Sequence, residues 1–308
     1  MMNRPKLFVM VGLNGSGKSS IAKEIAKEFD CVIISYDEIY GGICDGVVSD
    51  QSKNDEVFEI FHKRIKENLQ LGKSVIADAT NITMRSRRSI IGYLSSVDCY
   101  KIAYIVPKQF DKCIEDNIDR EYPVPEEVIK KQMMRFQIPF LEEGFDEIYI
   151  HKFTNPSVTD KFVVDCLTRM IGFDQKNPHH NLDLYHHCSS VKDKFKKLNG
   201  YVQTEYVFGA MLHDLGKVFT QTFDDNGVAH YYNHENVGCY YLLSWFESIK
   251  RYRDYDDEEI LNILFLVNYH MMPMAWKDEQ TNNKWCKRFG EYKYRLLLDF
   301  NKCDKTRE

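Results

Sequence analysis

The run Gly12-Leu13-Asn14-Gly15-Ser16-Gly17-Lys18-Ser19 constrains the fold of this chain more than any other feature of its sequence. Its spacing, GxxxxGK[ST], belongs between a buried strand and a helix, because the loop wraps backbone N–H groups around a phosphate at the helix N-terminus. The apolar run Leu7–Gly12 precedes the loop, and apolar residues recur at helical spacing over Lys18–Phe29 after it. The sequence therefore predicts a strand, a phosphate loop and a helix at the start of an α/β domain.

Three more apolar runs continue this pattern, at Cys31–Ser35, Ser74–Ala77 and Cys99–Val106. Segments of helical spacing lie between and after them, and we predict helices there at 53–70, 84–96, 108–119 and 125–138. Strands that alternate with helices favour a parallel sheet with helices on its faces. The first half of the chain is thus expected to be α/β.

The pattern changes at about Phe162, where strand-like runs nearly vanish and helical spacing takes over. We expect an all-α domain there, with helices over Val207–Leu212, Val237–Ile249 and Ile260–His270. The Asn155-Pro156-Ser157 cluster makes Phe153–Asp160 the expected linker. The predicted domains are therefore residues 1–155 and 160–308.

Composition limits the class of protein. With 308 residues, 44% of them hydrophobic and 28% charged, the chain has room for two soluble domains, and its apolar runs are too short to span a membrane. The nine cysteines show no CxxC pairing, which indicates reduced thiols in a cytoplasmic protein. A net charge of −5 gives no overall attraction for nucleic acid, so a polynucleotide would need local basic patches.

The phosphate loop predicts a site for ATP or another NTP with Mg²⁺. Lys18 is expected to reach the β- and γ-phosphates, and the hydroxyl of Ser19 to ligate Mg²⁺. The predicted nucleotide-binding residues are Gly12, Asn14, Gly15, Ser16, Gly17, Lys18, Ser19 and Ser20.

Downstream residues indicate what receives the phosphate. Asp37 follows the second strand, where a carboxylate can accept the proton of an attacking hydroxyl, or else cap the next helix. Arg120 lies in the segment Asn117–Pro125, which can close over the phosphates and stabilise charge. The basic run Arg85–Arg88 follows the Asp78-Ala79-Thr80-Asn81 block and is either part of the site or a solvated helix face.

These blocks together resemble the 5′-OH polynucleotide kinase branch of the P-loop phosphotransferases, over about residues 6–150. The resemblance implies that Asp37 is the general base and Arg120 the lid arginine. Two positions depart from it: Tyr40 replaces an arginine that would hold the acceptor's phosphate, and Asp116 replaces a second lid arginine. The second departure can shift the charge stabilisation to Arg135.

A second site is indicated by His213-Asp214-Leu215-Gly216-Lys217, which ends the apolar helix predicted at 207–212. Adjacent imidazole and carboxylate groups can turn toward one metal ion, and this mixture suits Mn²⁺, Fe²⁺, Ni²⁺, Co²⁺ or Mg²⁺. His187, His234, His270 and Asp304 provide further candidate ligands in the order H…HD…H…H…D.

That order resembles the HD family of metal-dependent phosphohydrolases, and the text around it resembles the HD domains of tRNA CCA-adding enzymes over about residues 172–308. The resemblance implies that one metal ion is held by His187, His213, Asp214 and Asp304, and that His234 and His270 bring in a second. Lys217 is then expected to neutralise a phosphate oxygen.

Other residues near this site have open roles. His180 and Asp183 are candidates for contacting the substrate or for holding the metal ligands in place. His186 is interpreted as structural, and Asp299 is the alternative to Asp304 as the last metal ligand. His62 and His151 are interpreted as ordinary.

The leading hypothesis is a bifunctional enzyme that heals nucleic-acid ends, RNA more than DNA, with a ligase as the downstream partner. It would phosphorylate a 5′-hydroxyl and hydrolyse a 2′,3′-cyclic phosphate or a 2′- or 3′-phosphate. A nucleoside or metabolite kinase joined to a nucleotide phosphohydrolase is the main alternative. A third is an NTP- and metal-dependent switch with little turnover.

Overall fold

The computed structural model describes residues 4–43, 53–120, 123–153, 161–176, 182–198, 202–249 and 256–305. They fall into two compact units. The first comprises Met1–Ile129 and Pro139–His151, and the second comprises Lys130–Ile138 and Lys152–Glu308. The domain ranges 1–155 and 160–308 stay a prediction, and residues 154–160 of the expected linker lie outside the described residues.

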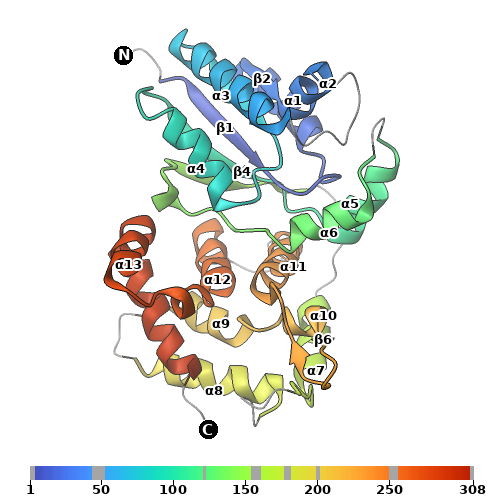
Figure 1. Cartoon of the computed structure of the whole chain (residues 1–308), viewed down its shortest axis with the longest axis vertical. Helices are drawn as coiled ribbons and strands as arrows, with labels where there is room; N and C mark the ends of the chain where they lie inside the picture. The colour runs from blue at the N-terminus through green and yellow to red at the C-terminus, as the bar shows by residue number, and fades with distance from the viewer. Residues whose placement is uncertain are drawn as a thin grey trace. The chain divides into compact units, whose positions relative to one another are not determined.

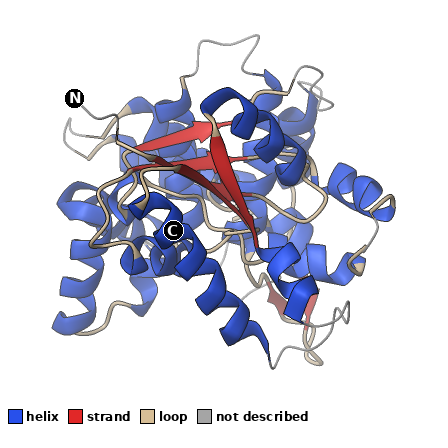
Figure 2. Ribbon diagram, turned by 90° about the horizontal axis from the view of Figure 1, so that it is seen from above, coloured by secondary structure: helices blue, strands red, loops and turns tan. Residues whose placement is uncertain are grey.

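A five-stranded parallel sheet forms the centre of the first unit (Figures 1 and 2). Its strand order is β2-β3-β1-β4-β5. The chain winds from β1 toward β2 on one side and later crosses to β4 on the other, so a crevice opens at the carboxyl end of β1. The phosphate loop begins at that end. The strands are β1 (Lys6–Val11), β2 (Cys31–Ser35), β3 (Ser74–Asp78), β4 (Tyr100–Ile105) and β5 (Glu147–Ile150).

Helices connect these strands. They are α1 (Lys18–Phe29), α2 (Tyr36–Ile43), α3 (Asn54–Gln70), α4 (Met84–Tyr93), α5 (Phe110–Ile118) and α6 (Glu126–Met133), with the 3-10 turn η2 (Leu141–Glu143). The four predicted strands and the expected α/β class are confirmed. The helix expected over 125–138 ends earlier, at Met133. The sequence reasoning did not predict α2 or β5.

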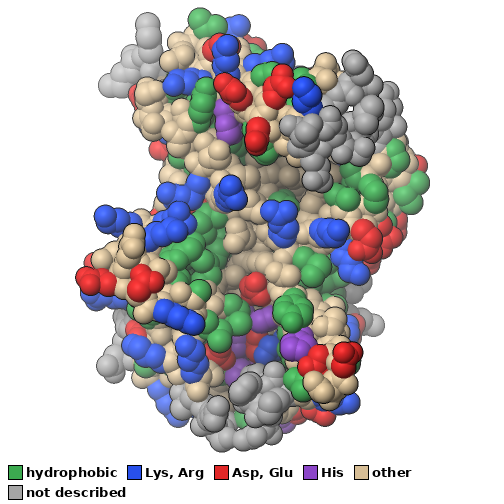
Figure 3. Space-filling model, viewed as in Figure 1, with side chains coloured by type: hydrophobic (Ala, Val, Ile, Leu, Met, Phe, Trp, Pro, Cys, Tyr) green, Lys and Arg blue, Asp and Glu red, His purple; other side chains and the backbone are tan. Residues whose placement is uncertain are grey.

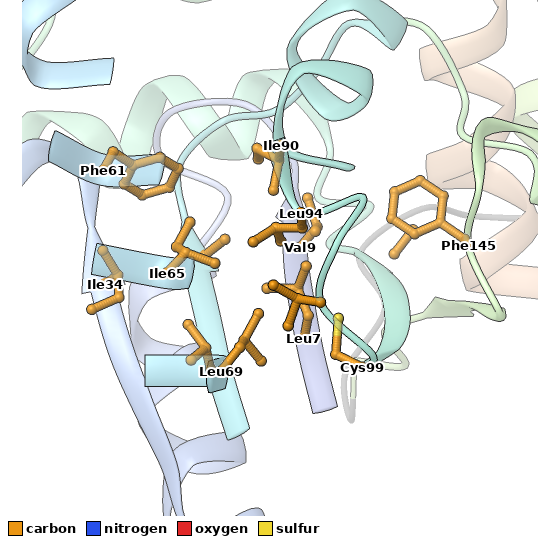
Figure 4. Close-up of a cluster of buried hydrophobic side chains, with 14 of the residues drawn as sticks. Leu7, Val9, Ile34, Phe61, Ile65, Leu69, Ile90, Leu94, Cys99 and Phe145 are labelled. Atoms are coloured by element: carbon orange, nitrogen blue, oxygen red, sulfur yellow. The ribbon is translucent and has the colours of Figure 1, made fainter. Parts of the chain in front are cut away.

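Alternation along β1 divides the side chains between the two faces of the sheet. Leu7 and Val9 are buried on one face, against Ile65 and Leu69 of α3 and Leu94 just after α4 (Figure 4). On the other face Phe8 packs against Phe29 of α1, with ring centroids 5.5 Å apart. Packing on both faces fixes the strand from which the phosphate loop starts.

The second unit is helical, as expected for the second half of the chain. It contains α7 (Lys161–Met170), α8 (Leu184–Lys196), α9 (Thr204–Leu212), α10 (Lys217–Thr220), α11 (His234–Ile249), α12 (Asp257–Tyr269), the 3-10 turn η3 (Met272–Ala275) and α13 (Glu279–Lys305). A small hairpin of β6 (Thr222–Phe223) and β7 (Ala229–His230) was not expected. Within the described ranges, no helix is both long and apolar enough to cross a membrane.

The segment 134–138 packs within this second unit. Asn268 accepts a hydrogen bond from the Ile138 backbone N–H at 2.7 Å and donates to Asn236 at 2.9 Å. Asn236 donates to the Met134 carbonyl at 2.9 Å, and the Tyr269 hydroxyl donates to the Ile138 carbonyl at 2.7 Å. These buried bonds tie the segment to α11 and α12 close to His234 and His270.

Candidate functional site

The phosphate loop joins β1 to α1 in a shape that only glycine allows at two positions. Gly15 and Gly17 have φ of 79° and 90°, in the left-handed region. A Cβ on Gly15 would also lie 1.9 Å from the Cys113 carbonyl oxygen of α5. Lys18, the first residue of α1, donates to the Leu13 carbonyl at 2.7 Å and so closes the loop.

A cavity of about 240 Å³ opens on this loop. Its lining contains six of the eight residues predicted to bind the nucleotide, and also Asp37 and Arg120. Gly12 and Ser16 are not in the lining: Gly12 donates its N–H to the Thr80 carbonyl at 3.0 Å, and Ser16 is fully buried. The lining residues are Asn14, Gly15, Gly17, Lys18, Ser19, Ser20, Asp37, Asp78, Ala79, Thr80, Asp116 and Arg120.

The predicted base and the predicted lid arginine are in contact. Arg120 donates to Asp37 at 3.2 Å, and the Asp37 side chain is 72% exposed. Asp37 lies inside the first turn of α2, and the Ser35 hydroxyl accepts from the Glu38 N–H at 3.3 Å in the capping position. The alternative interpretation of Asp37 as the helix cap is therefore wrong.

Asp78 is a further group of this site that was not among the predicted site residues. It ends β3, is 7% exposed and lines the cavity. Burial raises the pKa of its carboxyl, while Lys18 and a hydrogen bond with the Ser19 side chain act in the opposite direction. Its position directly after an apolar strand is the sequence signal that could have singled it out.

Within the arginine run, Arg87 has a different role from either interpretation offered for the run, whereas Arg85 is exposed, as the solvated-face interpretation predicts. Arg87 is fully buried and makes two bonds to Glu143, at 2.6 and 2.8 Å. It also donates to the Asn81 carbonyl at 3.1 Å, and the Asn81 side chain donates to the Met10 carbonyl at 2.9 Å. Arg87 therefore fixes the loop after β3 against β1, and it is neither a cavity residue nor part of a solvated face.

In the second unit, the six predicted metal-binding residues come together. His187, His234 and Asp304 lie in α8, α11 and α13, and the turns after α9 and α12 provide His213, Asp214 and His270. Asp214 lies at their centre. Its Oδ2 is 3.3 Å from His213 Nε2 and 3.6 Å from His187 Nε2, and its Oδ1 is 2.9 Å from His234 Nε2 and 3.6 Å from His270 Nε2.

Asp304, near the end of α13, completes this cluster. Its Oδ1 lies 3.1 Å from His187 Nε2 and 3.5 Å from His213 Nε2. Asp299, the rival candidate, instead pairs with Lys302 at 2.7 Å. Two groups of donors thus share Asp214: His187 and His213 on one side, His234 and His270 on the other.

The donor set fits divalent cations. Nδ1 of His213, His234 and His270 each lies 2.8 Å from a backbone carbonyl oxygen, which fixes the proton on Nδ1 and leaves the Nε2 lone pair facing the cluster. His213 Nε2 is buried and has no hydrogen-bond partner in the described part of the chain. A buried nitrogen left in this way is costly, and a bound cation would satisfy it.

Lys217 lies directly beside the cluster and is 6% exposed. It donates to Asp214 Oδ2 at 2.7 Å and to Gln175 Oε1 at 3.0 Å. Burial alone would raise the pKa of the Asp214 carboxyl, but Lys217 and His213 lower it well below its usual range. Gln175, 1% exposed, was missed because nothing in its local sequence distinguishes it.

Two other candidates have structural contacts. Asp183 caps α8, since it accepts from the His186 N–H at 2.8 Å and from the Gly172 N–H at 2.9 Å. His186 contacts the same carboxylate and lies outside the cluster. His180 falls outside the described residues.

Comparison with known proteins bears on the first site. A family model described as an AAA domain matches residues 7–139. The N-terminal part of the chain is a P-loop kinase domain. The L-seryl-tRNA(Sec) kinase of Methanococcus maripaludis is 26% identical over 145 residues, which is 46% of this chain and 56% of that protein. The chain thus spans about half the length of this curated relative.

Two solved structures are similar to parts of the chain. One is described as the Pnkp1/Rnl/Hen1 RNA repair complex, with 19% identity, a TM-score of 0.39, and coverage of 43% of this chain and 44% of that chain. The other is a fungal RNA kinase, with 16% identity, a TM-score of 0.36, and coverage of 67% of this chain and 95% of that chain.

Proposed function

We propose that this chain is a bifunctional enzyme that heals RNA ends. The P-loop kinase domain would transfer the γ-phosphate of ATP, or of another NTP, to a 5′-hydroxyl. The histidine–aspartate cluster would hydrolyse a 2′,3′-cyclic phosphate or a 2′- or 3′-phosphate, as in an HD phosphohydrolase. The observation that carries the proposal is that one chain combines a phosphate-loop cavity containing Asp37 and Arg120 with five candidate metal ligands gathered around a sixth, Asp214.

In the kinase reaction, Asp37 accepts the proton of the attacking 5′-hydroxyl, whose oxygen forms the new bond to the γ-phosphorus. The bond from the γ-phosphorus to the β–γ bridging oxygen breaks, and ADP (or the other NDP) leaves with that oxygen. The P-loop kinase family implies ATP with Mg²⁺ as the donor. The Ser19 hydroxyl, held by Asp78, would ligate the Mg²⁺, which neutralises charge on the phosphates. Arg120 exchanges its contact with Asp37 for the transferring group. This exchange costs little, because an exposed ion pair contributes about 0–1 kcal/mol.

At the second site, His187, His213, Asp214 and Asp304 would hold one divalent ion, and His234 and His270 would hold a second with Asp214. Mn²⁺, Ni²⁺, Co²⁺, Fe²⁺ or Mg²⁺ bound there supplies a water of lowered pKa and positive charge for the phosphate oxygens. Asp214 uses different oxygens for the two groups of histidines. Lys217, held between Asp214 and Gln175, places an ammonium beside the cluster to stabilise negative charge on the phosphate.

Two features support an RNA substrate. A chain break that leaves a 5′-hydroxyl also leaves a blocked 3′ end, so the two reactions together prepare both ends for a ligase. The similar protein named L-seryl-tRNA(Sec) kinase supports an acceptor that is attached to RNA.

The test uses one short RNA that carries a 5′-hydroxyl and a 2′,3′-cyclic phosphate. We expect wild type to label the 5′ end from γ-labelled ATP with Mg²⁺, and to open or remove the cyclic phosphate with Mn²⁺, Ni²⁺ or Co²⁺. Lys18→Ala should abolish only the labelling, and Asp214→Ala only the 3′ reaction. A wild type that leaves both ends unchanged would reject the proposal.

A nucleoside or metabolite kinase joined to a nucleotide phosphohydrolase is the alternative. It is favoured by Tyr40, which replaces the arginine that would hold a polynucleotide acceptor's phosphate in the kinases that this domain resembles, and by the net charge of −5. Phosphorylation of mononucleosides, with 5′-hydroxyl oligonucleotides ignored, would decide for it.

A further inference from the structure

A surface on η3 and α13 combines an aromatic stack with basic side chains. Trp285 is partly exposed, and its ring lies 6.1 Å from Trp276 and 5.3 Å from Phe289, each at 20°. Trp276 is 7% exposed and Phe289 is buried, so they support Trp285 from below. Tyr294 stacks on Trp276 at 5.1 Å and 19°. A broad, rigid aromatic platform results, with the ring of Trp285 at the surface.

Cations surround this ring. Arg288 and Lys284 lie over it, 4.9 and 5.8 Å from its centroid, and Lys287 is exposed on the same helix. Between residues 277 and 295 the sequence has six Lys or Arg and three Asp or Glu, in a chain whose net charge is −5. Figure 3 shows Lys and Arg side chains gathered at the left of the view, over α13. The surface is therefore a local basic patch on an acidic protein.

The platform lies near two residues of the histidine–aspartate cluster along the chain. His270 precedes η3, with Met271 between them, and Trp276 follows directly on η3. Asp304 lies near the end of α13, after a kink at Gly290, where φ is 74°. Phe300 of α13 packs edge-on against His213 and His270, at 5.1 and 6.0 Å. The platform and the cluster thus belong to one packed assembly of helices.

We propose that this surface binds the single-stranded RNA whose 3′ end is hydrolysed at the cluster. A base would stack on Trp285, and Lys284, Lys287 and Arg288 would contact the backbone phosphates. Aromatic platforms flanked by cations bind single strands in this way, with little preference for sequence. The inference rests on the proposed function, and it names the part of the chain that would hold a polymer rather than a mononucleotide.

Binding is measured by fluorescence anisotropy of a labelled 12-nucleotide RNA with a 5′-phosphate and a 3′-hydroxyl, so that neither end can react. Lys284→Glu/Lys287→Glu should raise Kd by about ten-fold or more at low salt and flatten the dependence of log Kd on log[KCl]. Trp285→Ala should raise Kd by about ten-fold, and Trp285→Phe should restore most of the affinity.

Lys196→Glu/Lys197→Glu is the matched control. It makes the same charge change at the C-terminal end of α8, where both lysines are exposed and the neighbouring aromatic residue, Phe195, is fully buried. We expect this variant to bind as wild type does. An equal loss in the control, or wild-type affinity in Lys284→Glu/Lys287→Glu, would overturn the inference.

Turnover separates binding from a structural effect. The platform variants should raise KM for an RNA that ends in a 2′,3′-cyclic phosphate, and leave hydrolysis of a 2′,3′-cyclic mononucleotide unchanged. An equal loss with both substrates would show that the surface only supports the fold. If wild type hydrolyses neither substrate, the proposed hydrolase function fails, while the binding measurement still decides the present inference.

Discussion

Replacing His234 by alanine tests whether the cluster holds two cations. Its Nε2 lies 2.9 Å from Asp214 Oδ1 and 3.3 Å from His270 Nε2, so these three residues would form one site and His187, His213, Asp214 and Asp304 the other. Binding free energies of about 10–16 kcal/mol for four-ligand zinc sites correspond to about 3 kcal/mol per ligand. Loss of His234 should therefore weaken one of the two sites by about 100-fold in Kd.

The assay is metal content by mass spectrometry after dialysis, together with calorimetric titration of the metal-free protein with Mn²⁺. We expect two ions per chain in wild type and one in His234→Ala. His186→Ala is the matched control, because His186 is a nearby exposed histidine that contacts Asp183 and lies outside the cluster. Two ions of unchanged affinity in His234→Ala, or a loss in His186→Ala, would refute the shared-carboxylate argument.

Three further variants test other parts of the structure. Asp37→Asn should lower kcat for 5′-phosphorylation by about 10²–10⁴-fold with ATP binding unchanged, and Glu38→Gln should have little effect; equal activity of both variants would reject Asp37 as the base. Glu143→Gln leaves the Arg87 charge buried and unpaired, which should cost about 3–5 kcal/mol and lower the unfolding temperature of the first unit by about 6–20 °C in calorimetry; an unchanged transition would contradict this. Asn268→Ala removes the acceptor of the buried Ile138 N–H, and should cost about 1–3 kcal/mol in urea unfolding; a loss below that range would show that the segment 134–138 contributes little.

Local sequence patterns predicted the elements that are determined locally. The four apolar strands and the phosphate loop follow from periodicity and from the spacing of glycines. β5 was missed because Glu147–Ile150 is a short strand at the edge of the sheet, with one exposed and two half-buried side chains. α2 was missed because it starts directly after β2, with no separating turn.

Contacts between distant residues could not be predicted in this way. The partner of Arg87 is Glu143, 56 positions away, so a basic run looked like a solvated face or a phosphate-binding group. The contact of Gln175 with Lys217 was missed for a similar reason, because the two residues are 42 positions apart in the sequence. The candidate ligands were identified by their order along the chain, but that order does not indicate that each oxygen of Asp214 faces a different pair of histidines.

One local rule nevertheless accounts for how two of these histidines are oriented. His213 and His270 each directly follow an apolar helix, α9 and α12, and each has its Nδ1 at the carbonyl oxygen three residues earlier, Ala210 or Val267. The last carbonyls of a helix have no partner within it, so a histidine placed there satisfies one and turns its Nε2 away from the helix axis. His234, the first residue of α11, also has its Nδ1 at the carbonyl oxygen three residues earlier, but that carbonyl belongs to Tyr231 in the loop before the helix. A histidine just beyond an apolar helix is thus oriented before any metal binds, which is why ligands from separate helices can converge on one carboxylate.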